Sequence, residues 1–288
     1  MKKKKGGFTN FILIVAMVIG LSLLLYPSFS DWWNDMVQSR AIAHYEEQLA
    51  NMNKADFSKY WDAARSYNRT LLDRENIYTL TDEQKEQYPS LLTVNAHGVM
   101  GYIEIPAISC YLPIYHGTSE EVLQVAIGHL DWTSLPTGGA GTHCVVSGHR
   151  GLPSAKLFTD LDKMMVGDLF MLHVLDETLT YEVDSIQIVL PDQTESLKIE
   201  ADKDLVTLVT CTPYGINTHR LLVRGHRVEN AKEAIVVRIV ADAVQIEPLL
   251  IAAILAVPAL LIVLTVVLIG DSVEAKENRH HTEEETES

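Results

Sequence analysis

From Gly98 onward the sequence consists of short, β-branched apolar runs separated by Gly, Pro and Asp, and this pattern restricts the fold most strongly. Such short runs are typical of strands, and many of them at close spacing indicate a β-sandwich or a β-barrel. We therefore expect a mainly β domain over residues 98–230. The expected strands are Val99–Ile105, Leu112–Ile114, Cys144–Ser147, Leu169–Val174, Leu179–Leu190, Asp204–Cys211 and His219–Glu229, with helical turns at Glu120–Ile127 and Leu157–Lys163.

The residues before this domain have a helical composition. Residues 27–74 are rich in Ala, Gln, Glu, Met and Leu, and Ser30 and Asp31 are suited to cap the start of a helix. Residues 75–97 are polar and lack a clear period, which predicts a long loop with a helical turn around Asp82–Tyr88. The expected packing positions of the helical region are Trp32, Trp33, Tyr45, Leu49, Tyr60 and Trp61, although the two tryptophans also suit a membrane interface.

Two apolar runs, residues 8–26 and 249–269, frame the chain. At about 1.5 Å of rise per residue, the first can cross a bilayer core of roughly 30 Å. A cleaved signal peptide is the alternative, but the run is long for one and no obvious small-x-small cleavage site follows Tyr26. Pro258 interrupts the second run, and membrane helices tolerate such a proline. A buried core helix is the alternative for this run, but such a helix would normally show a polar face. We expect two transmembrane helices.

The basic block Lys2–Lys5 predicts the orientation, because positive residues stay in the cytoplasm. Residues 1–7 are then cytoplasmic, and the chain from about residue 28 to 247 is extracellular, including a linker at 231–248. The acidic tail, residues 270–288, returns to the cytoplasm. The formal net charge of −15 argues against nucleic acid as a partner, because phosphate binding needs clustered Lys and Arg.

The three cysteines are too few for a disulfide framework. In an extracellular domain their odd number predicts at least one free thiol, while a Cys110–Cys144 disulfide stays open. The sequence has no Cys-x-x-Cys pair, no His-x-x-x-His pair and no acidic loop of calcium type. It therefore predicts no metal and no cofactor.

Cys211 ends a strand-like run, and Pro213 and Gly215 make the chain turn directly after it. A strand end beside a turn suits a reactive group, because the scaffold is rigid and the tip is accessible. Arg220 opens the next apolar run, so two strands joined by a short loop would bring the thiol and the guanidinium together. A guanidinium that stays charged can bind substrate or stabilise an oxyanion.

A reactive thiol also needs a base, and His149 lies at the end of another expected strand, between Gly148 and Gly151. Sequence spacing leaves two interpretations open: a Cys211–His149 site, or a buried cysteine and a loop histidine. The other histidines are expected to be structural or exposed: His97, His116, His129, His143, His173, His219 and His226. His219 should face the opposite side of its strand from Arg220.

These residues stand in motifs that resemble the sortase family. Thr207–Cys211 matches Thr-Leu-x-Thr-Cys, and the resemblance is closest to the class C, pilin-polymerising sortases of Gram-positive bacteria. Further similar stretches are Gly98–Pro106, Leu112–Thr118, Ser147–Pro153 and Cys211–Gly225. The resemblance implies an eight-stranded sortase-type β-barrel with N-terminal helices, flanked here by the two transmembrane helices. It also assigns the nucleophile to Cys211, the catalytic histidine to His149 and the arginine to Arg220.

The resemblance implies a transpeptidase. In sortases a thiolate attacks the Thr–Gly bond of an LPxTG-like sorting signal, and an amine resolves the acyl-enzyme. In class C the amine is typically a lysine of the next pilin, so the implied partners are pilins or surface proteins with such signals and an acceptor amine. The alternatives are a sortase that uses a peptidoglycan precursor as acceptor, a cysteine hydrolase, and a non-catalytic domain that binds the cell wall.

The pattern departs from the family at the lid. Class C sortases usually carry an Asp-Pro-aromatic motif there, and no Asp-Pro occurs in this chain. Ile77 and Tyr78 stand where the anchoring aromatic residue is expected. We expect an atypical or mobile lid within residues 75–97.

Overall fold

The computed structural model describes residues 6–72, 74, 76–94 and 98–230, together with Pro258 and Thr265. The chain divides into two compact units, residues 1–30 with 236–288, and residues 31–235. The expected linker, second apolar run, acidic tail and first five residues lie outside the described residues, apart from Pro258 and Thr265, which are helical.

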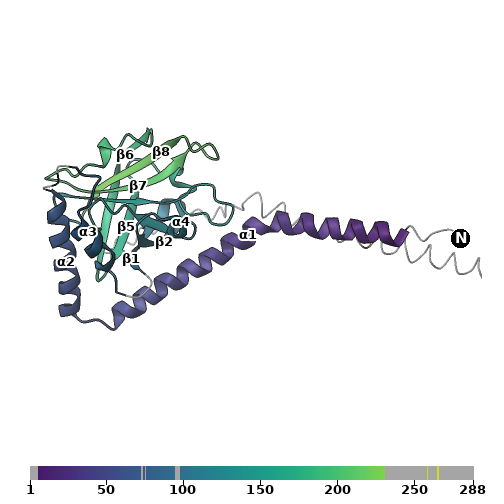
Figure 1. The fold of residues 1–288 in the computed structure, drawn as a ribbon, viewed down its shortest axis with the longest axis horizontal. Helices are drawn as coiled ribbons and strands as arrows, with labels where there is room; N and C mark the ends of the chain where they lie inside the picture. Colours follow the sequence, from purple (N-terminus) through teal and green to yellow (C-terminus); the bar gives the residue numbers. More distant parts are fainter. Residues whose placement is uncertain are drawn as a thin grey trace, which may run out of the picture. The chain divides into compact units, whose positions relative to one another are not determined.

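Eight strands close into a barrel in the order β1-β2-β3-β4-β7-β8-β6-β5 (Figure 1). Neighbours pair antiparallel except for β2 with β3 and β4 with β7, which are parallel. Closure removes the unpaired edges of an open sheet. The predicted eight-stranded barrel is confirmed. The strands are β1 (Val99–Ile105), β2 (Cys110–His116), β3 (Ile127–His129), β4 (Thr142–Ser147), β5 (Leu169–Val174), β6 (Glu177–Val189), β7 (Asp204–Thr212) and β8 (His219–Arg227).

All seven expected strands form, with ends that differ by a few residues. The sequence pattern missed β3, because its three residues follow helix α4 (Glu120–Leu123) after a short turn and make no run of their own. The expected helical turn at Glu120–Ile127 is therefore shorter than predicted. Of the other expected helical turn, Leu157–Lys163, only the last three residues are helical, as the 3₁₀ helix η3 (Leu161–Lys163).

The prediction that Ser30 and Asp31 cap a helix is wrong. Helix α1 (Gly6–Ala50) runs through Pro27 and both residues without a break. Asp31 is used differently: its carboxylate accepts a hydrogen bond of 2.7 Å from the backbone N–H of Lys156 in a barrel loop. The remaining helices are α2 (Lys54–Leu72), α3 (Asp82–Gln87) and the 3₁₀ helices η1 (Tyr88–Ser90), η2 (Pro106–Ile108) and η4 (Glu195–Leu197).

One stripe of α1 packs on the barrel. Its members recur three or four positions apart, as on one helix face: Asp31, Asn34, Gln38, Ile42 and Tyr45. Trp32 and Trp33 lie off this stripe and are 57% and 50% exposed, so their predicted packing is wrong. Tyr45 and Trp61 are buried as expected, and Leu49 and Tyr60 pack against the core.

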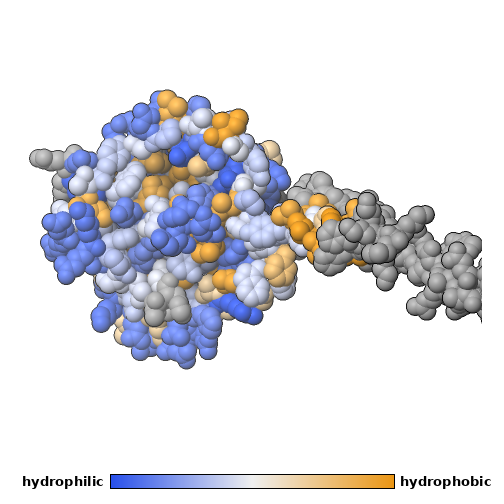
Figure 2. All heavy atoms as spheres, turned by 45° about the vertical axis from the view of Figure 1, so that its right-hand side comes forward, coloured by the Kyte–Doolittle hydropathy of each residue, from blue (hydrophilic) through white to orange (hydrophobic). Residues whose placement is uncertain are grey.

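The N-terminal part of α1 exposes apolar side chains. Among the described residues, one helix is long and apolar enough to cross a membrane, over Ile12–Ala50. That length and composition are compatible with the predicted anchor. The face of the barrel domain in Figure 2 is mainly hydrophilic, with separate apolar patches and a hollow with apolar atoms at its bottom.

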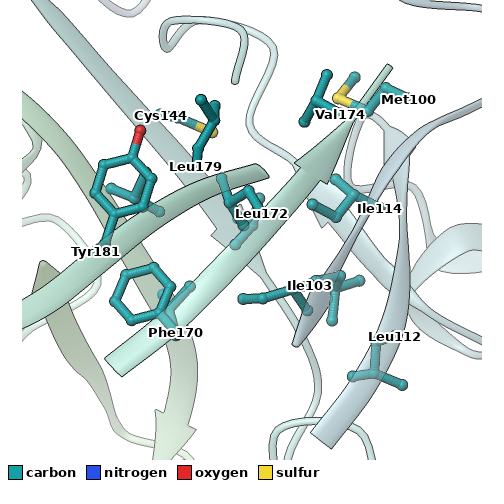
Figure 3. Packing of buried hydrophobic residues seen from close by; sticks show 14 of the residues in the cluster. Met100, Ile103, Leu112, Ile114, Cys144, Phe170, Leu172, Val174, Leu179 and Tyr181 are labelled. Atoms are coloured by element: carbon teal, nitrogen blue, oxygen red, sulfur yellow. The ribbon is translucent and has the colours of Figure 1, made fainter. Parts of the chain in front are cut away.

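Side chains at alternate positions fill the barrel. Figure 3 shows Ile103 of β1, Phe170 and Leu172 of β5 and Tyr181 of β6 gathered in this core. A second, smaller apolar cluster lies outside the barrel wall: Val145, Leu197, Val209 and Leu222, with Leu130, Trp132 and Val189 packed against it. Because side chains alternate along a strand, the two clusters show which positions of β4, β7 and β8 face outward.

Candidate active site

The strand register brings the three predicted residues to one level of the barrel wall. Cys211 of β7 is directly opposite Arg220 of β8. On the other side of β7, the parallel pairing with β4 ends at Ser147 opposite Val209. The backbone N–H of Gly148 then donates to the carbonyl of Val209 at 3.0 Å, which carries the pairing one step further. His149 is two residues beyond Ser147, as Cys211 is beyond Val209, so both residues follow the same end of the β4–β7 pairing.

Cys211 and Arg220 both face outward. Cys211 shares its side of β7 with Val209 of the outer cluster, whereas Leu208 points into the core. Arg220 shares its side of β8 with Leu222 of the outer cluster. His219 faces the other way, as predicted, because it pairs with Thr212.

Among the three thiols, Cys211 is the half-exposed one. Cys110 and Cys144 are buried, and all three are free. The open alternative of a Cys110–Cys144 disulfide is therefore wrong, and its reason is topological: β3 lies between β2 and β4 in the barrel. Burial raises the pKa of the Cys110 thiol to about 12 and also raises the pKa of the Cys144 thiol. Both stay protonated at neutral pH, which leaves Cys211 as the accessible thiol.

The threonines of the Thr-Leu-x-Thr-Cys motif hold the wall around the site. The Thr210 hydroxyl donates to the carbonyl of Gly148 at 2.8 Å and so fixes the turn before His149. The Thr207 hydroxyl lies 2.8 Å from Nε2 of His143, whose Nδ1 lies 2.9 Å from the carbonyl of Lys198. A carbonyl only accepts, so Nδ1 donates to Lys198 and Thr207 donates to Nε2. Burial lowers the pKa of His143, which keeps this bridge to the β6–β7 connection neutral.

Gly148 lets the chain after β4 pass close to Ile127 of β3 and to Phe158. A Cβ at this position would lie 2.8 Å from Cγ2 of Ile127 and 2.9 Å from Cδ2 of Phe158. Both contacts are shorter than real Cβ contacts, and both partners are fully buried. The backbone N–H of Phe158 also donates to the carbonyl of His149 at 3.1 Å. The loop that carries the histidine is thus fixed at both ends.

Arg220 is half-buried and bonded to its own loop. Its Nη1 donates to the carbonyls of Asn217 and His219 at 3.2 and 3.1 Å. These two bonds orient the guanidinium at the end of β8. Since a guanidinium has five N–H donors, others are left to face an anionic oxygen.

The two predicted lid residues lie along the chain between α2 and α3. Tyr78 packs edge-on against Trp132 with ring centroids 5.1 Å apart, and its hydroxyl accepts a 2.6 Å hydrogen bond from Thr194. Ile77 is half-buried. Arg74 adds a bond of 2.7 Å from Nη2 to the carbonyl of Trp132. Because Trp132 borders the outer cluster that contains Val209, this segment is fastened beside the wall that carries Cys211.

The described part of the expected loop, residues 76–94, contains more regular structure than its sequence suggests. Thr81 and Gln84 form a capping box at the start of α3, which confirms the expected helical turn. Tyr88 of η1 is buried, and its hydroxyl contacts His129 at 2.9 Å and accepts from the backbone N–H of Gly117 at 2.9 Å. Over the described part of the chain, no group of three or more His, Cys, Asp or Glu side chains could hold a metal ion.

Comparison with known proteins agrees with this geometry. Residues 103–228 match the sortase domain family. Sortase C1 from Streptococcus agalactiae is 51% identical, with a TM-score of 0.65 over 66% of this chain and 99% of that one. Sortase C from Streptococcus pneumoniae is 45% identical over 66% of this chain and 97% of its own, with a TM-score of 0.60. Sortase C from Clostridium perfringens, solved with the C-terminal cell-wall sorting motif, is 44% identical over 67% and 100%, with a TM-score of 0.59.

The chain therefore belongs to the sortase family of transpeptidases. Its similarity to these pilin sortases further defines it as a member of class C.

Sequence reasoning did not single out several residues that shape the site. Thr210, Thr207 and His143 act through contacts that span more than 50 residues of sequence. Arg150 is another, and its side chain is only 9% exposed. A signal was present for Arg150, because an arginine directly after the expected base, in a loop bounded by glycines, is suited to hold that loop.

Proposed function

We propose that this sortase joins pilin subunits through a thioacyl intermediate on Cys211. The Cys211 thiolate attacks the carbonyl carbon of the Thr in an LPxTG-like signal. The Thr–Gly bond breaks, and His149 gives its proton to the leaving glycine amine. An incoming amine then attacks the thioester, His149 takes its proton, and the thiolate is released. Arg220 stabilises the oxyanion of both steps.

The observation that supports this proposal best is the order of the three strands. Cys211 of β7 has Arg220 opposite it on β8 and the His149 turn beside it after β4. The nucleophile thus stands between a proton carrier and a fixed positive charge, and acyl transfer needs both.

Two relatives indicate the substrate. The Streptococcus pneumoniae sortase C has been analysed for pilin substrate specificity, and the Clostridium perfringens enzyme was solved with a cell-wall sorting motif. In this chain, Tyr214 and Ile216 of the loop that follows Cys211 are 60% and 67% exposed and offer an apolar surface. Such a surface suits the Leu and Pro of a sorting signal.

The test is to incubate the extracellular domain with a candidate pilin and to examine the products on a denaturing gel. Covalent ladders that disappear with Cys211→Ala support the proposal, and ladders that persist with this variant contradict it. The alternative acceptor is a peptidoglycan stem peptide. A conjugate with that peptide, and no ladder with pilin, would assign the chain to cell-wall anchoring.

We further propose a two-pass membrane topology with the catalytic domain extracellular. The apolar part of α1 and the basic block before it support the first span and its orientation. The apolar run at 249–269 supports the second. Protease added to intact cells should then remove the catalytic domain while the acidic tail stays protected.

We also propose that the segment around Ile77 and Tyr78 is a lid held without the usual motif. The Tyr78–Trp132 ring contact, the Tyr78–Thr194 hydrogen bond and the Arg74–Trp132 bond support this idea. They join the segment to the β3–β4 connection, which carries Trp132, and to the β6–β7 connection, which carries Thr194. The two Tyr78 contacts lie at the surface and the Arg74 bond is part-buried, and each is of modest strength, so the lid can open without unfolding the barrel.

A further inference from the structure

One guanidinium stands between the two chain segments that carry the nucleophile and the base. Arg150 directly follows His149, and its Nη1 donates to the hydroxyl of Thr212 at 3.3 Å. Thr212 directly follows Cys211. A single side chain therefore links the residue after the base to the residue after the nucleophile.

Two more contacts hold this guanidinium in place. Nη2 is bonded to the carboxylate of Asp162 in η3, and Cζ lies 5.9 Å from the centroid of the Tyr214 ring. Together with the bond to Thr212, these contacts surround the head group with an acid, a hydroxyl and an aromatic face. The side chain is 9% exposed, so solvent screens these contacts little.

The backbone beside Arg150 also packs against the β7–β8 loop, which carries Tyr214. Gly151 has a φ of +76°, and a Cβ there would lie 2.9 Å from Cε2 of Tyr214. The Tyr214 ring thus packs directly on the loop that carries His149. The β7–β8 loop and the His149 loop contact each other twice, through the Arg150 head group and through the Gly151 backbone.

We propose that Arg150 is a positioning residue that holds His149 at the correct distance from Cys211. The proposal rests on the proposed function, because it assigns those two residues the proton transfer and the nucleophilic attack. Arg150 differs in role from Arg220: its Nη1 and Nη2 are bonded to protein partners, and it acts on the reaction only through the residues beside it. Proton transfer is sensitive to such placement, and a displacement of about 1 Å can cost on the order of 100-fold in rate.

The shape of the side chain matters as well as its charge. A guanidinium presents a planar fork that can bond two partners while it lies over a ring, whereas an ammonium group is a compact point charge. Lysine at position 150 would keep the charge and lose the simultaneous contact with Asp162 and Thr212. Arg150→Lys is therefore the informative substitution.

The test is a double-mutant cycle on the extracellular domain with Arg150→Lys, Thr212→Val and the double variant. Cleavage of a fluorogenic LPxTG peptide gives kcat and KM for each. We expect Arg150→Lys to lower kcat by about 10- to 100-fold with KM changed less than about twofold. The double variant should be no slower than Arg150→Lys alone, because both changes remove one shared contact.

Arg65→Lys is the matched control. Arg65 also pairs with a carboxylate, Glu177 at 3.6 Å, and lies over an aromatic ring, Trp61 at 5.0 Å, but it belongs to α2. It should keep the kcat of the wild type. Thermal unfolding of each variant separates a loss of folded protein from a loss of positioning.

Three results would overturn the inference while the proposed function stands. They are an unchanged kcat for Arg150→Lys, fold-changes that multiply in the double variant, and a loss of kcat that only follows the loss of folded protein. If instead the wild-type domain cleaves and transfers no peptide, the proposed function itself fails.

Discussion

Cys211 and Arg220 lie directly opposite each other on the antiparallel strands β7 and β8, and both side chains face outward. Directly opposed residues have Cβ atoms about 4.5–5.5 Å apart, so the guanidinium can reach an oxyanion that forms next to the thiol. The thiol and the guanidinium are therefore adjacent without any movement of the β7–β8 loop. The barrel therefore sets the spacing between the thiol and the positive charge before a substrate binds.

Arg220→Ala should lower kcat on the order of 10²–10³-fold, because it removes the donors proposed to stabilise the oxyanion. Arg220→Lys should restore only part of the rate, since an ammonium group cannot reproduce the fork. Peptide cleavage measures both. Arg227→Ala is the control, because Arg227 lies at the far end of the same strand and contacts Asp204 and Tyr181. A kcat for Arg220→Ala within about threefold of the wild type would contradict the role.

A thiol reagent should label Cys211 alone in the folded protein at pH 7. Cys110 and Cys144 are buried, and burial raises the pKa of both thiols. Since the thiolate is the reactive form, they should react only after unfolding. Mass spectrometry should find one adduct per folded chain, none with Cys211→Ser, and three adducts per wild-type chain in denaturant. Labelling of folded Cys211→Ser would show that the barrel opens to solvent.

Tyr78→Ala should speed the labelling of Cys211 if the segment around Tyr78 restricts access to the thiol. The substitution removes one hydrogen bond and one ring contact, worth about 0.5–1.5 kcal/mol each. A rise of about 2- to 10-fold in the labelling rate is expected, with a smaller rise for Thr194→Val. A point substitution is preferable to deleting residues 75–89, because that deletion also removes Tyr88, which is buried and bonded to the barrel.

Tyr111→Ala provides the control for this lid measurement. Tyr111 is 43% exposed, close to the 44% of Tyr78, but lies on β2. Equal labelling rates for the wild type and Tyr78→Ala would show that the segment does not guard the thiol.

The barrel was predictable because its strands alternate inside and outside and end at Gly, Pro or Asp. β3 was not, since Ile127–His129 is too short to show a period. The continuous helix α1 was not predictable either, because the Pro27 and Ser30 region reads locally as a break. A residue that suits a helix cap does not mark a helix end when its side chain bonds a distant segment instead, as Asp31 bonds the backbone of Lys156.

The candidate groups of the site could be proposed from the sequence because a motif marks each one. Their supports could not, because each is a contact between distant segments. The bonds from Thr210 to Gly148 and from Arg150 to Thr212 both span 62 residues. No local pattern of polarity or propensity encodes such a pair. The sequence therefore supplied the candidate reacting groups, and the structure was needed to find what holds them.

Stability should fall as the pH is lowered from 7 to 5, and His129 should contribute much of the fall. Its ring is fully buried between Tyr88 and the carbonyl of Ser134, and burial lowers its pKa from 6.5 to about 3. Between these two values the unfolded chain binds a proton that the folded chain does not. The free energy of unfolding therefore decreases as the pH falls through this window, by about 2 kcal/mol at pH 5.

His129→Gln isolates this contribution. Its amide can still donate to the Ser134 carbonyl but does not titrate, so the variant should be less stable at pH 7 and yet lose less stability between pH 7 and 5. Urea unfolding at pH 7 and at pH 5 gives the change in the free energy of unfolding with pH for the wild type and for the variant. His44→Gln is the control, since the His44 side chain is 66% exposed and should leave the wild-type slope unchanged. The pKa values of half-buried His116 and buried His143 are also lowered by desolvation, so a residual slope of the same sign should remain in His129→Gln. Equal slopes in wild type and His129→Gln would mean that the ring is protonated in the folded protein, and that the network around Tyr88 holds a charge.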